Sequence, residues 1–230
     1  MSNNYFGHSF VKKYIMLKNH LNLNAVRYAA IMVSVMWFGY LLQYIGLFTG
    51  CSGAIIPLNP HGLKGIFLSP FLHGSREHLF GNSVPIFVLI FLLFQFYPFI
   101  ARKVFFLGWI LTGFLVWLLP PIDIYTREFN TVCIIGASGL VYVFAFFIFF
   151  SGVFRWNMKL LTVSMVVALY YGSLIWGVIP EELFSNLPEP SRISWQSHLS
   201  GAVIGIMMAF IFRKSGEKKV KFIWEFPNYY

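Results

Sequence analysis

Charged residues are scarce in this sequence. Asp, Glu, Lys and Arg make up 11% of the 230 residues, whereas an average soluble domain has about 25%. Hydrophobic residues make up 58%, and phenylalanine alone contributes 27 residues. So few charges cannot cover the water-facing surface of so apolar a chain. The composition therefore excludes a soluble enzyme, a disordered protein and a disulfide-stapled secreted module, and it favours a multi-pass membrane protein.

Cysteine is nearly absent as well. Cys51 and Cys133 are too few and too far apart for a metal motif. We interpret them as two ordinary thiols rather than as a structural disulfide. A cleavable signal peptide is also missing, because the first apolar run follows about 27 polar and mixed residues and has no small-residue cleavage site. No internal repeat is visible, so an inverted-repeat transporter has no support.

Six charge-free runs are each near or above the length that a membrane-spanning helix needs. Because they are continuous rather than alternating, they favour helices over a β-barrel. The runs are Tyr28–Phe48, Leu79–Ile100, Val104–Ile122, Phe129–Phe154, Leu160–Pro180 and Ile193–Phe212. The sequence therefore predicts an all-α membrane protein, a bundle of six transmembrane helices.

The basic residues predict how this bundle lies in the membrane. With six spans, 13 of the 17 Lys and Arg residues fall on the side of the two termini, which the positive-inside rule makes cytoplasmic. The charge is thus a topology signal, and no basic stripe with interleaved aromatics indicates nucleic-acid binding. We divide the chain into an N-terminal cytoplasmic segment (1–26), a six-helix domain (27–213) and a basic, aromatic cytoplasmic tail (214–230). The tail either rests on lipid headgroups or is a disordered end.

The first outer loop, about Thr49 to Glu77, is long and rich in apolar residues. A loop of this length and composition is not expected to extend freely into water. We expect it to fold back and lie partly in the outer leaflet.

Polar groups interrupt the apolar runs at three places, and polar side chains inside a membrane are functional candidates by default. They are His73, His78 and Asn82 near the start of the second helix; Gly136, Ser138 and Gly139 near the start of the fourth; and His198, Gly201 and Gly205 near the start of the sixth. These three helices run in the same direction. At ~1.5 Å per residue, Ser138 and His198 are both expected roughly 10 Å below the outer surface, so the polar groups can meet in one cavity open to the outside.

An activated serine fits this set of residues. Ser138 would be the nucleophile and His198 the base that takes its proton. His78, Asn82 and the backbone N–H of Ser138 are suited to bind the oxyanion. No carboxylate lies inside any run, so a dyad is predicted rather than a triad.

Small and aromatic residues support the same site. Gly136 and Gly139 let the backbone approach closely around Ser138, and Gly201 and Gly205 form a small-residue face by which the sixth helix packs on the fourth. Tyr142 lies one turn after Ser138 on the same helix face. Its ring is placed to stack on His198.

Other interpretations of single residues remain open. Taken alone, the serine, the histidine and the glycines are each typical of helix packing. A zinc site from His73, Glu77, His78 and His198 is disfavoured, because His73 and His78 are five residues apart and match neither H-E-x-x-H nor H-x-x-E-H. We predict no metal and no cofactor.

The three groups closely resemble the motifs of the rhomboid family of intramembrane serine proteases. The family has H-x-x-x-x-H-x-x-x-N at its second helix, G-x-S-G at its fourth and H-x-x-G-x-x-x-G at its sixth. All three occur here in order, and a tyrosine four residues after the serine also matches. The resemblance covers about Val26 to Arg213. One departure is that the first outer loop lacks the Trp-Arg pair of many members and has no tryptophan at all.

The resemblance implies a six-helix fold, a Ser138–His198 dyad and an oxyanion hole of His78, Asn82 and the Ser138 amide. His73 would be a supporting polar residue. The implied function is endoproteolysis of single-span membrane proteins within the bilayer, and the expected location is a bacterial inner membrane. Two alternatives are a pseudoprotease that binds transmembrane segments without cutting them and a small transporter or channel. The intact serine and histidine argue against the first, and the absence of charges within the spans argues against the second.

Overall fold

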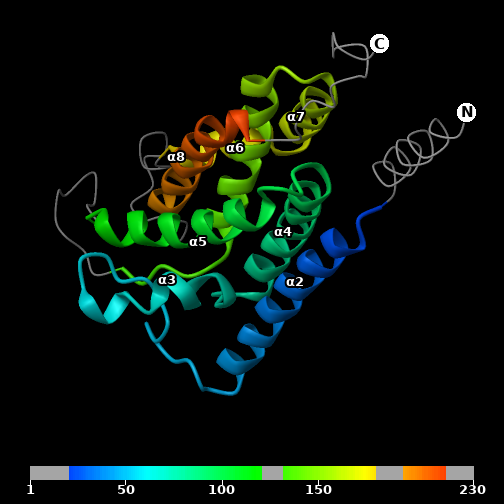
Figure 1. The fold of residues 1–230 in the computed structure, drawn as a ribbon. Helices are drawn as coiled ribbons and strands as arrows, with labels where there is room; N and C mark the ends of the chain where they lie inside the picture. Colours follow the sequence, from blue (N-terminus) through cyan, green and yellow to red (C-terminus); the bar gives the residue numbers. More distant parts are fainter. Residues whose placement is uncertain (1–20, 121–131, 180–193, 216–230) are drawn as a thin grey trace, which may run out of the picture.

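The computed structural model describes residues 21–120, 132–179 and 194–215. Within these ranges six helices are long and apolar enough to cross a membrane (Figure 1). They are α2 (Leu23–Tyr44), α4 (Arg76–Phe96), α5 (Ala101–Leu118), α6 (Ser138–Arg155), α7 (Met158–Tyr171) continued by the 3-10 helix η3 (Gly172–Val178), and α8 (Trp195–Ile211) continued by η5 (Phe212–Lys214). The predicted all-α fold of six membrane-spanning helices is confirmed.

The predictions for the C-terminal tail, for most of the N-terminal segment and for the two loops at 121–131 and 180–193 fall outside the described residues. The first helix begins at Leu23, before residue 27, the predicted start of the six-helix domain. The side chain of Asn22 accepts a hydrogen bond from the backbone N–H of Asn24, and this cap explains the earlier start.

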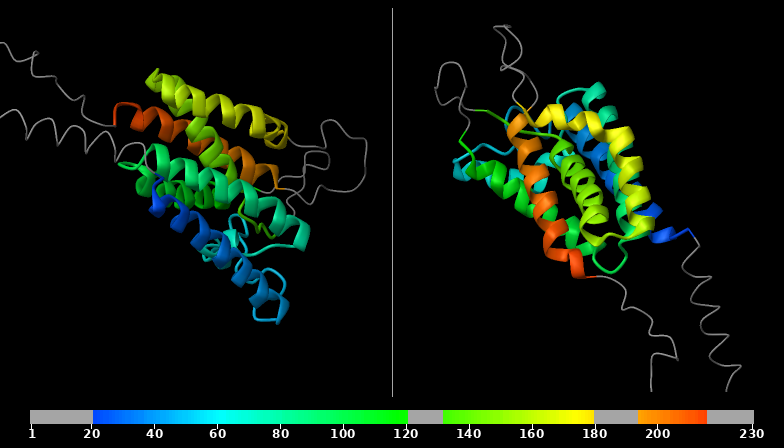
Figure 2. Two further views of the ribbon diagram at one scale, coloured as in Figure 1. Left: turned by 90° about the vertical axis from the view of Figure 1, so that its right-hand side faces the viewer. Right: turned by 90° about the horizontal axis from the view of Figure 1, so that it is seen from above.

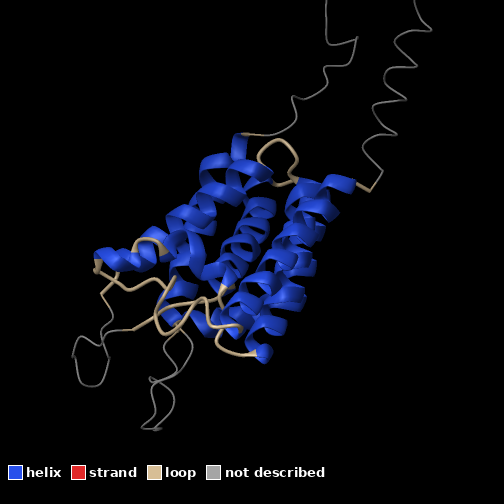
Figure 3. Ribbon diagram, turned by 90° about the horizontal axis from the view of Figure 1, so that it is seen from below, coloured by secondary structure: helices blue, strands red, loops and turns tan. Residues whose placement is uncertain are grey.

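The bundle has two unlike ends (Figure 3). One end, which we call the loop end, holds the long connection from α2 to α4 and the segment 132–137 that leads into α6. The other, the turn end, holds the short connections from α4 to α5 and from α6 to α7. The start of α2 and the end of η5 also lie at the turn end (Figure 3).

Helix α6 is the centre of the bundle and α7 lies at its edge (Figure 2). Among the six spans, α6 is the most buried within the protein and the α7–η3 span the least. The helix pair with the most extensive contact is α6 with α8. Large apolar side chains on the outer faces, such as Phe106, Leu169 and Phe210, are exposed, as expected for helices whose solvent is lipid.

Several helix boundaries differ from the predicted spans. The fourth span begins at Ser138 instead of Phe129. The uncharged residues just before it are not helical, because Ile134 forms an antiparallel bridge with Ile55 and Gly136 has φ of +113°. Likewise α2 ends at Tyr44 rather than Phe48 and α4 ends at Phe96 rather than Ile100. A charge-free run therefore indicates which part of the chain can lie in the membrane, but it does not show where the helix begins or ends.

The long loop between α2 and α4 packs on α5. It contains the short helices η1 (Pro60–Gly62), α3 (Gly65–Leu68) and η2 (Ser69–Phe71), and α3 lies against α5 (Figure 1). Two tryptophans of α5 hold the backbone of this loop. Trp109 Nε1 donates to the carbonyl of Ile66 and Trp117 Nε1 donates to the carbonyl of Asn59, both at 2.8 Å. The loop has no tryptophan of its own, and α5 supplies the indoles that fix it.

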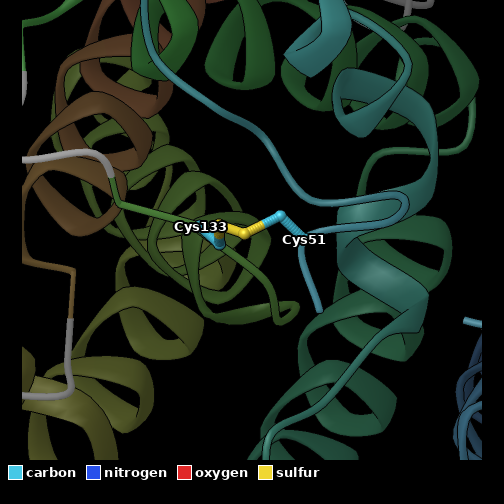
Figure 4. Close-up of a disulfide and its surroundings, with 2 residues drawn as sticks. All are labelled: Cys51 and Cys133. Atoms are coloured by element: carbon cyan, nitrogen blue, oxygen red, sulfur yellow. A yellow bond between two sulfur atoms is a disulfide. The ribbon is translucent and has the colours of Figure 1, made fainter. Parts of the chain in front are cut away.

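A disulfide joins this loop to the segment before α6 (Figure 4). It links Cys51 to Cys133, with Cα atoms 5.4 Å apart. The interpretation of the two cysteines as ordinary thiols is therefore wrong. The two cysteines are 82 residues apart in the sequence, and this separation does not indicate that they meet. They meet because the loop folds back along the segment that leads to α6.

Candidate active site

The first turns of α4 carry two of the predicted site residues. Ser75 caps this helix by accepting a hydrogen bond from the backbone N–H of His78, which sets the helical register. That register places His78 and Asn82 on one face, and both side chains lie against Gly136. A Cβ atom added to Gly136 would lie 2.7 Å from Cε1 of His78 and 3.7 Å from Nδ2 of Asn82. Glycine is thus required at position 136 for two reasons: a side chain would collide with His78, and the positive φ is unfavourable for other residues.

Asn82 is a buried donor without an acceptor. Its side chain is 5% exposed, and Nδ2 has no hydrogen-bond partner. Buried polar atoms are nearly always paired in proteins, so this donor is available to an acceptor that the chain itself does not supply. Asn82 Nδ2 lies next to the segment that leads into Ser138. A negatively charged acceptor formed at Ser138 could therefore accept a hydrogen bond from it.

Ser138 is the first residue of α6. The backbone N–H groups in the first turn of a helix have no intrahelical partner, and the helix dipole makes this end positive. The segment before Ser138 is held from the other side, since Gly136 N donates to the carbonyl of Ser69 at 2.8 Å. The serine therefore stands at the junction of a fixed loop and an electropositive helix end.

His198 is held by two contacts from neighbouring elements. Its ring is stacked on Tyr142, with centroids 4.2 Å apart and planes inclined by 10°, which is the stacking expected from the sequence. Its Nδ1 lies 2.9 Å from the carbonyl oxygen of Gly177 in η3. Ser194 caps α8 by accepting from Ser197 N, so His198 lies in the first turn of its helix at the loop end.

Glycines allow α6 and α8 to approach each other. A Cβ added to Gly201 would meet the carbonyl oxygen of Gly139 and lie 2.9 Å from Cβ of Tyr142. A Cβ on Gly205 would lie 2.5 Å from the carbonyl oxygen of Val143. The predicted small-residue face is therefore present, and it brings the helix with His198 onto the helix with Ser138 and Tyr142.

His73 lies beside this group, just before α4. Its ring is 2% exposed and makes an edge-to-face contact with His78, at 5.1 Å between centroids. Burial, with a smaller contribution from His78, lowers the pKa of His73 to about 4. The imidazole is therefore neutral at physiological pH. Its backbone N–H donates to Oε1 of Gln43 at 2.8 Å, which ties the loop to α2.

One expected contact is not formed. The hydrogen bonds of the described residues do not include one between Ser138 and His198. Catalytic hydrogen bonds are often long before substrate binds, so this geometry does not remove either residue from the site. Among the described residues there is also no group of three or more His, Cys, Asp or Glu side chains that could hold a metal ion.

Sequence reasoning missed two contributors to the site. Gln43 is a polar residue inside the first predicted span, and this signal could have marked it. Gly177 acts through its backbone carbonyl, and no pattern in the sequence indicates that contact. Its role depends on how η3 returns toward α8.

Fold and site together define a multi-pass membrane protein with a polar cluster of serine, histidine and asparagine at one end of its helices. The chain belongs to the rhomboid family, because the family model described as Rhomboid domain matches residues 60–215. Members of this family are generally intramembrane serine proteases, and some are inactive.

Relatives occur in mycobacteria. The chain is 31% identical over 186 residues to a protein of Mycobacterium tuberculosis named Uncharacterized protein Rv1337, covering 77% of this chain and 73% of the relative. A protein of Mycobacterium bovis, Uncharacterized protein Mb1372, matches with the same values. Uncharacterized protein ML1171 of Mycobacterium leprae is 29% identical over 170 residues, covering 71% of this chain and 61% of the relative.

Proposed function

We propose that this protein is an active intramembrane serine endopeptidase with Ser138 as nucleophile and His198 as base. The observation that carries the proposal is the placement of Ser138 between two contacts. Two residues before it, Gly136 lies against His78 and Asn82; four residues after it, Tyr142 is stacked on His198. A base and a set of donors therefore flank one serine.

The reaction would proceed through an acyl-enzyme. The Ser138 hydroxyl attacks the scissile carbonyl carbon while its proton moves to Nε2 of His198. As the carbon–nitrogen bond breaks, the imidazolium returns that proton to the leaving amine. A water molecule then loses a proton to His198 and attacks the ester carbonyl carbon. The ester carbon–oxygen bond breaks, and His198 returns the proton to the Ser138 oxygen, which releases the second fragment and restores the serine.

The oxyanion of each tetrahedral intermediate needs donors that are already in place. Asn82 Nδ2, the His78 ring and the Ser138 N–H at the start of α6 are proposed for this role. The orphan state of Asn82 Nδ2 supports the assignment. Losing one such donor typically lowers kcat by about 10²- to 10³-fold.

The site is proposed to face the outside of the cell membrane, with both termini cytoplasmic. The charge distribution supports this orientation, and so does the disulfide, because disulfides persist outside the reducing cytosol. The disulfide lies at the loop end, whereas the start of α2 and the end of η5 lie at the turn end (Figure 3). The mycobacterial relatives support a bacterial inner membrane. Substrates are proposed to be single-span membrane proteins, cut near the outer end of their helix.

A fluorophosphonate probe tests the proposal, since it reacts covalently with activated serines. The purified protein in detergent is expected to be labelled at Ser138, and labelling should be lost in Ser138→Ala and His198→Ala. Ser151→Ala is the matched control, because Ser151 lies near the other end of α6 and its side chain accepts from Arg155. Substrate binding without labelling would indicate a pseudoprotease. Labelling that persists in Ser138→Ala would exclude Ser138 as the nucleophile.

A further inference from the structure

The base of the proposed dyad has a fixed orientation although no carboxylate holds it. Nδ1 of His198 lies 2.9 Å from the carbonyl oxygen of Gly177. A carbonyl oxygen can only accept, so Nδ1 must carry the hydrogen of the neutral ring. The lone pair is then on Nε2, which is the state that a general base requires.

In a serine protease triad an acidic side chain performs this task by accepting from Nδ1–H. In the described part of the chain no acidic side chain lies near Nδ1 of His198. Glu77 is the single acidic residue there, and it is exposed at the first turn of α4, bonded to the cap region of that helix. The ring instead receives its orientation from a backbone carbonyl and from the Tyr142 face.

We propose that the Gly177 carbonyl is the positioning group for His198 and fixes its catalytic tautomer. This proposal rests on the proposed protease function. Gly177 touches neither substrate nor the reacting atoms; it acts through His198. The fixed hydrogen bond lets the ring accept the Ser138 proton at Nε2 without first changing tautomer.

Glycine is required at this position for the carbonyl to come so close. A Cβ added to Gly177 would meet the Tyr142 hydroxyl oxygen and lie 3.2 Å from Nδ1 of His198. Gly172, at the start of the same 3-10 helix, has nothing within 4 Å of its added Cβ. The close approach is therefore specific to the residue that faces the histidine.

The position of Gly177 also makes the base sensitive to the least packed span. Its carbonyl belongs to η3, which continues α7, and this span is the least buried of the six. The other partner of the ring, Tyr142, lies on the most buried helix. The stacking of Tyr142 on His198 is thus held by the core of the bundle. The tautomer of His198 depends instead on η3, at the edge of the bundle. A displacement of η3 away from α8 would break the hydrogen bond to His198, whereas Tyr142 and His198 lie on α6 and α8, which pack on each other.

The tautomer can be measured directly by ¹⁵N NMR of histidine-labelled full-length protein, at a pH where the ring is neutral. The wild type is expected to show His198 with hydrogen on Nδ1. Gly177→Ala should show a mixture or the other tautomer, with kcat reduced at least tenfold and KM for substrate changed less than twofold. For comparison, loss of the correct tautomer in the serine protease triad costs about 10⁴-fold. Gly172→Ala is the matched control and should leave both readouts unchanged.

A second variant avoids the added side chain. Replacing Val178 by its α-hydroxy acid turns the Gly177 carbonyl into an ester carbonyl, a weaker acceptor. This change should lower kcat roughly tenfold. The same replacement at Ile175, which weakens the carbonyl of Leu174 instead, should not. A wild-type ring with hydrogen on Nε2, or an unchanged kcat in the Val178 ester, would overturn the proposal. Because the tautomer signal does not require activity, it is readable even if Ser138 proves not to be a nucleophile.

Discussion

At the scale of single residues, the site depends on polar groups that burial leaves unpaired. Asn82 Nδ2 and both ring nitrogens of His73 are buried without hydrogen-bond partners. Unpaired buried groups cost stability, and functional sites are where proteins retain them. For Asn82 the acceptor is proposed to be the oxyanion. For His73 the consequence is different, because its burial and, to a smaller extent, its neighbour His78 oppose protonation of the ring.

The low pKa of His73 predicts a loss of stability in acid. Its pKa is about 4 when folded, against 6.5 for the free side chain, so the unfolded state binds more protons between these values. Stability is therefore complete above pH 6.5 and declines as the pH falls toward 4. Between pH 7 and pH 5 this one group should reduce the free energy of unfolding by about 2 kcal/mol.

Thermal unfolding in detergent at pH 7 and pH 5 checks this prediction. The fall in Tm between the two should be smaller in His73→Gln than in the wild type. An equal fall in both proteins would show that His73 does not control the acid sensitivity.

At the scale of secondary structure elements, the approach of α6 to α8 decides whether the dyad can form. Gly139 and Gly201 lie where the two helices meet, and Ser138 and His198 lie just beyond them. The sequence predicted this face from the spacing of Gly201 and Gly205, because small residues are what permits close helix approach in a membrane. It did not predict that α6 would begin at the serine itself.

Gly201→Ala should therefore separate the two helices. Its Cβ would meet the Gly139 carbonyl oxygen, which is a backbone atom and cannot rotate aside as a side chain can. We expect a loss of about 1–3 kcal/mol in stability, together with reduced labelling of Ser138. Gly81→Ala is the matched control. It lies within α4 with nothing within 4 Å of its added Cβ, so it should be neutral or stabilising. Equal Tm changes in both variants would contradict the packing argument.

At the scale of the whole molecule, the sequence predicted the class of fold and the residues that meet at one end of it. Charge-free runs indicate membrane spans because charges are so costly in lipid, and motifs on helices of the same direction must share a depth. Contacts made through the backbone could not be predicted. The Gly177 carbonyl, the bridge of Ile55 with Ile134 and the Cys51–Cys133 pairing all depend on how loops fold back.

The disulfide is predicted to hold the loop end together. It closes a long stretch of chain, since Cys51 and Cys133 are 82 residues apart, and the loop-entropy estimate for such a link is at most about 4.5 kcal/mol. Cys51→Ala with Cys133→Ala should lower Tm and slow the labelling of Ser138. Treating the wild type with a reducing agent should reproduce both effects, and the double variant should not respond to it. A wild-type Tm that is insensitive to reduction would contradict this role.

We propose that Ser138 and His198 together cut peptide bonds within the membrane. The most direct measurement uses liposomes that contain the purified protein and a single-span substrate, followed by mass spectrometry of the products. We expect two fragments from one cleavage near the outer end of the substrate helix. Ser138→Ala and His198→Ala should give no fragments, and Ser151→Ala should cleave normally. Cleavage that persists in Ser138→Ala would exclude Ser138 as the nucleophile.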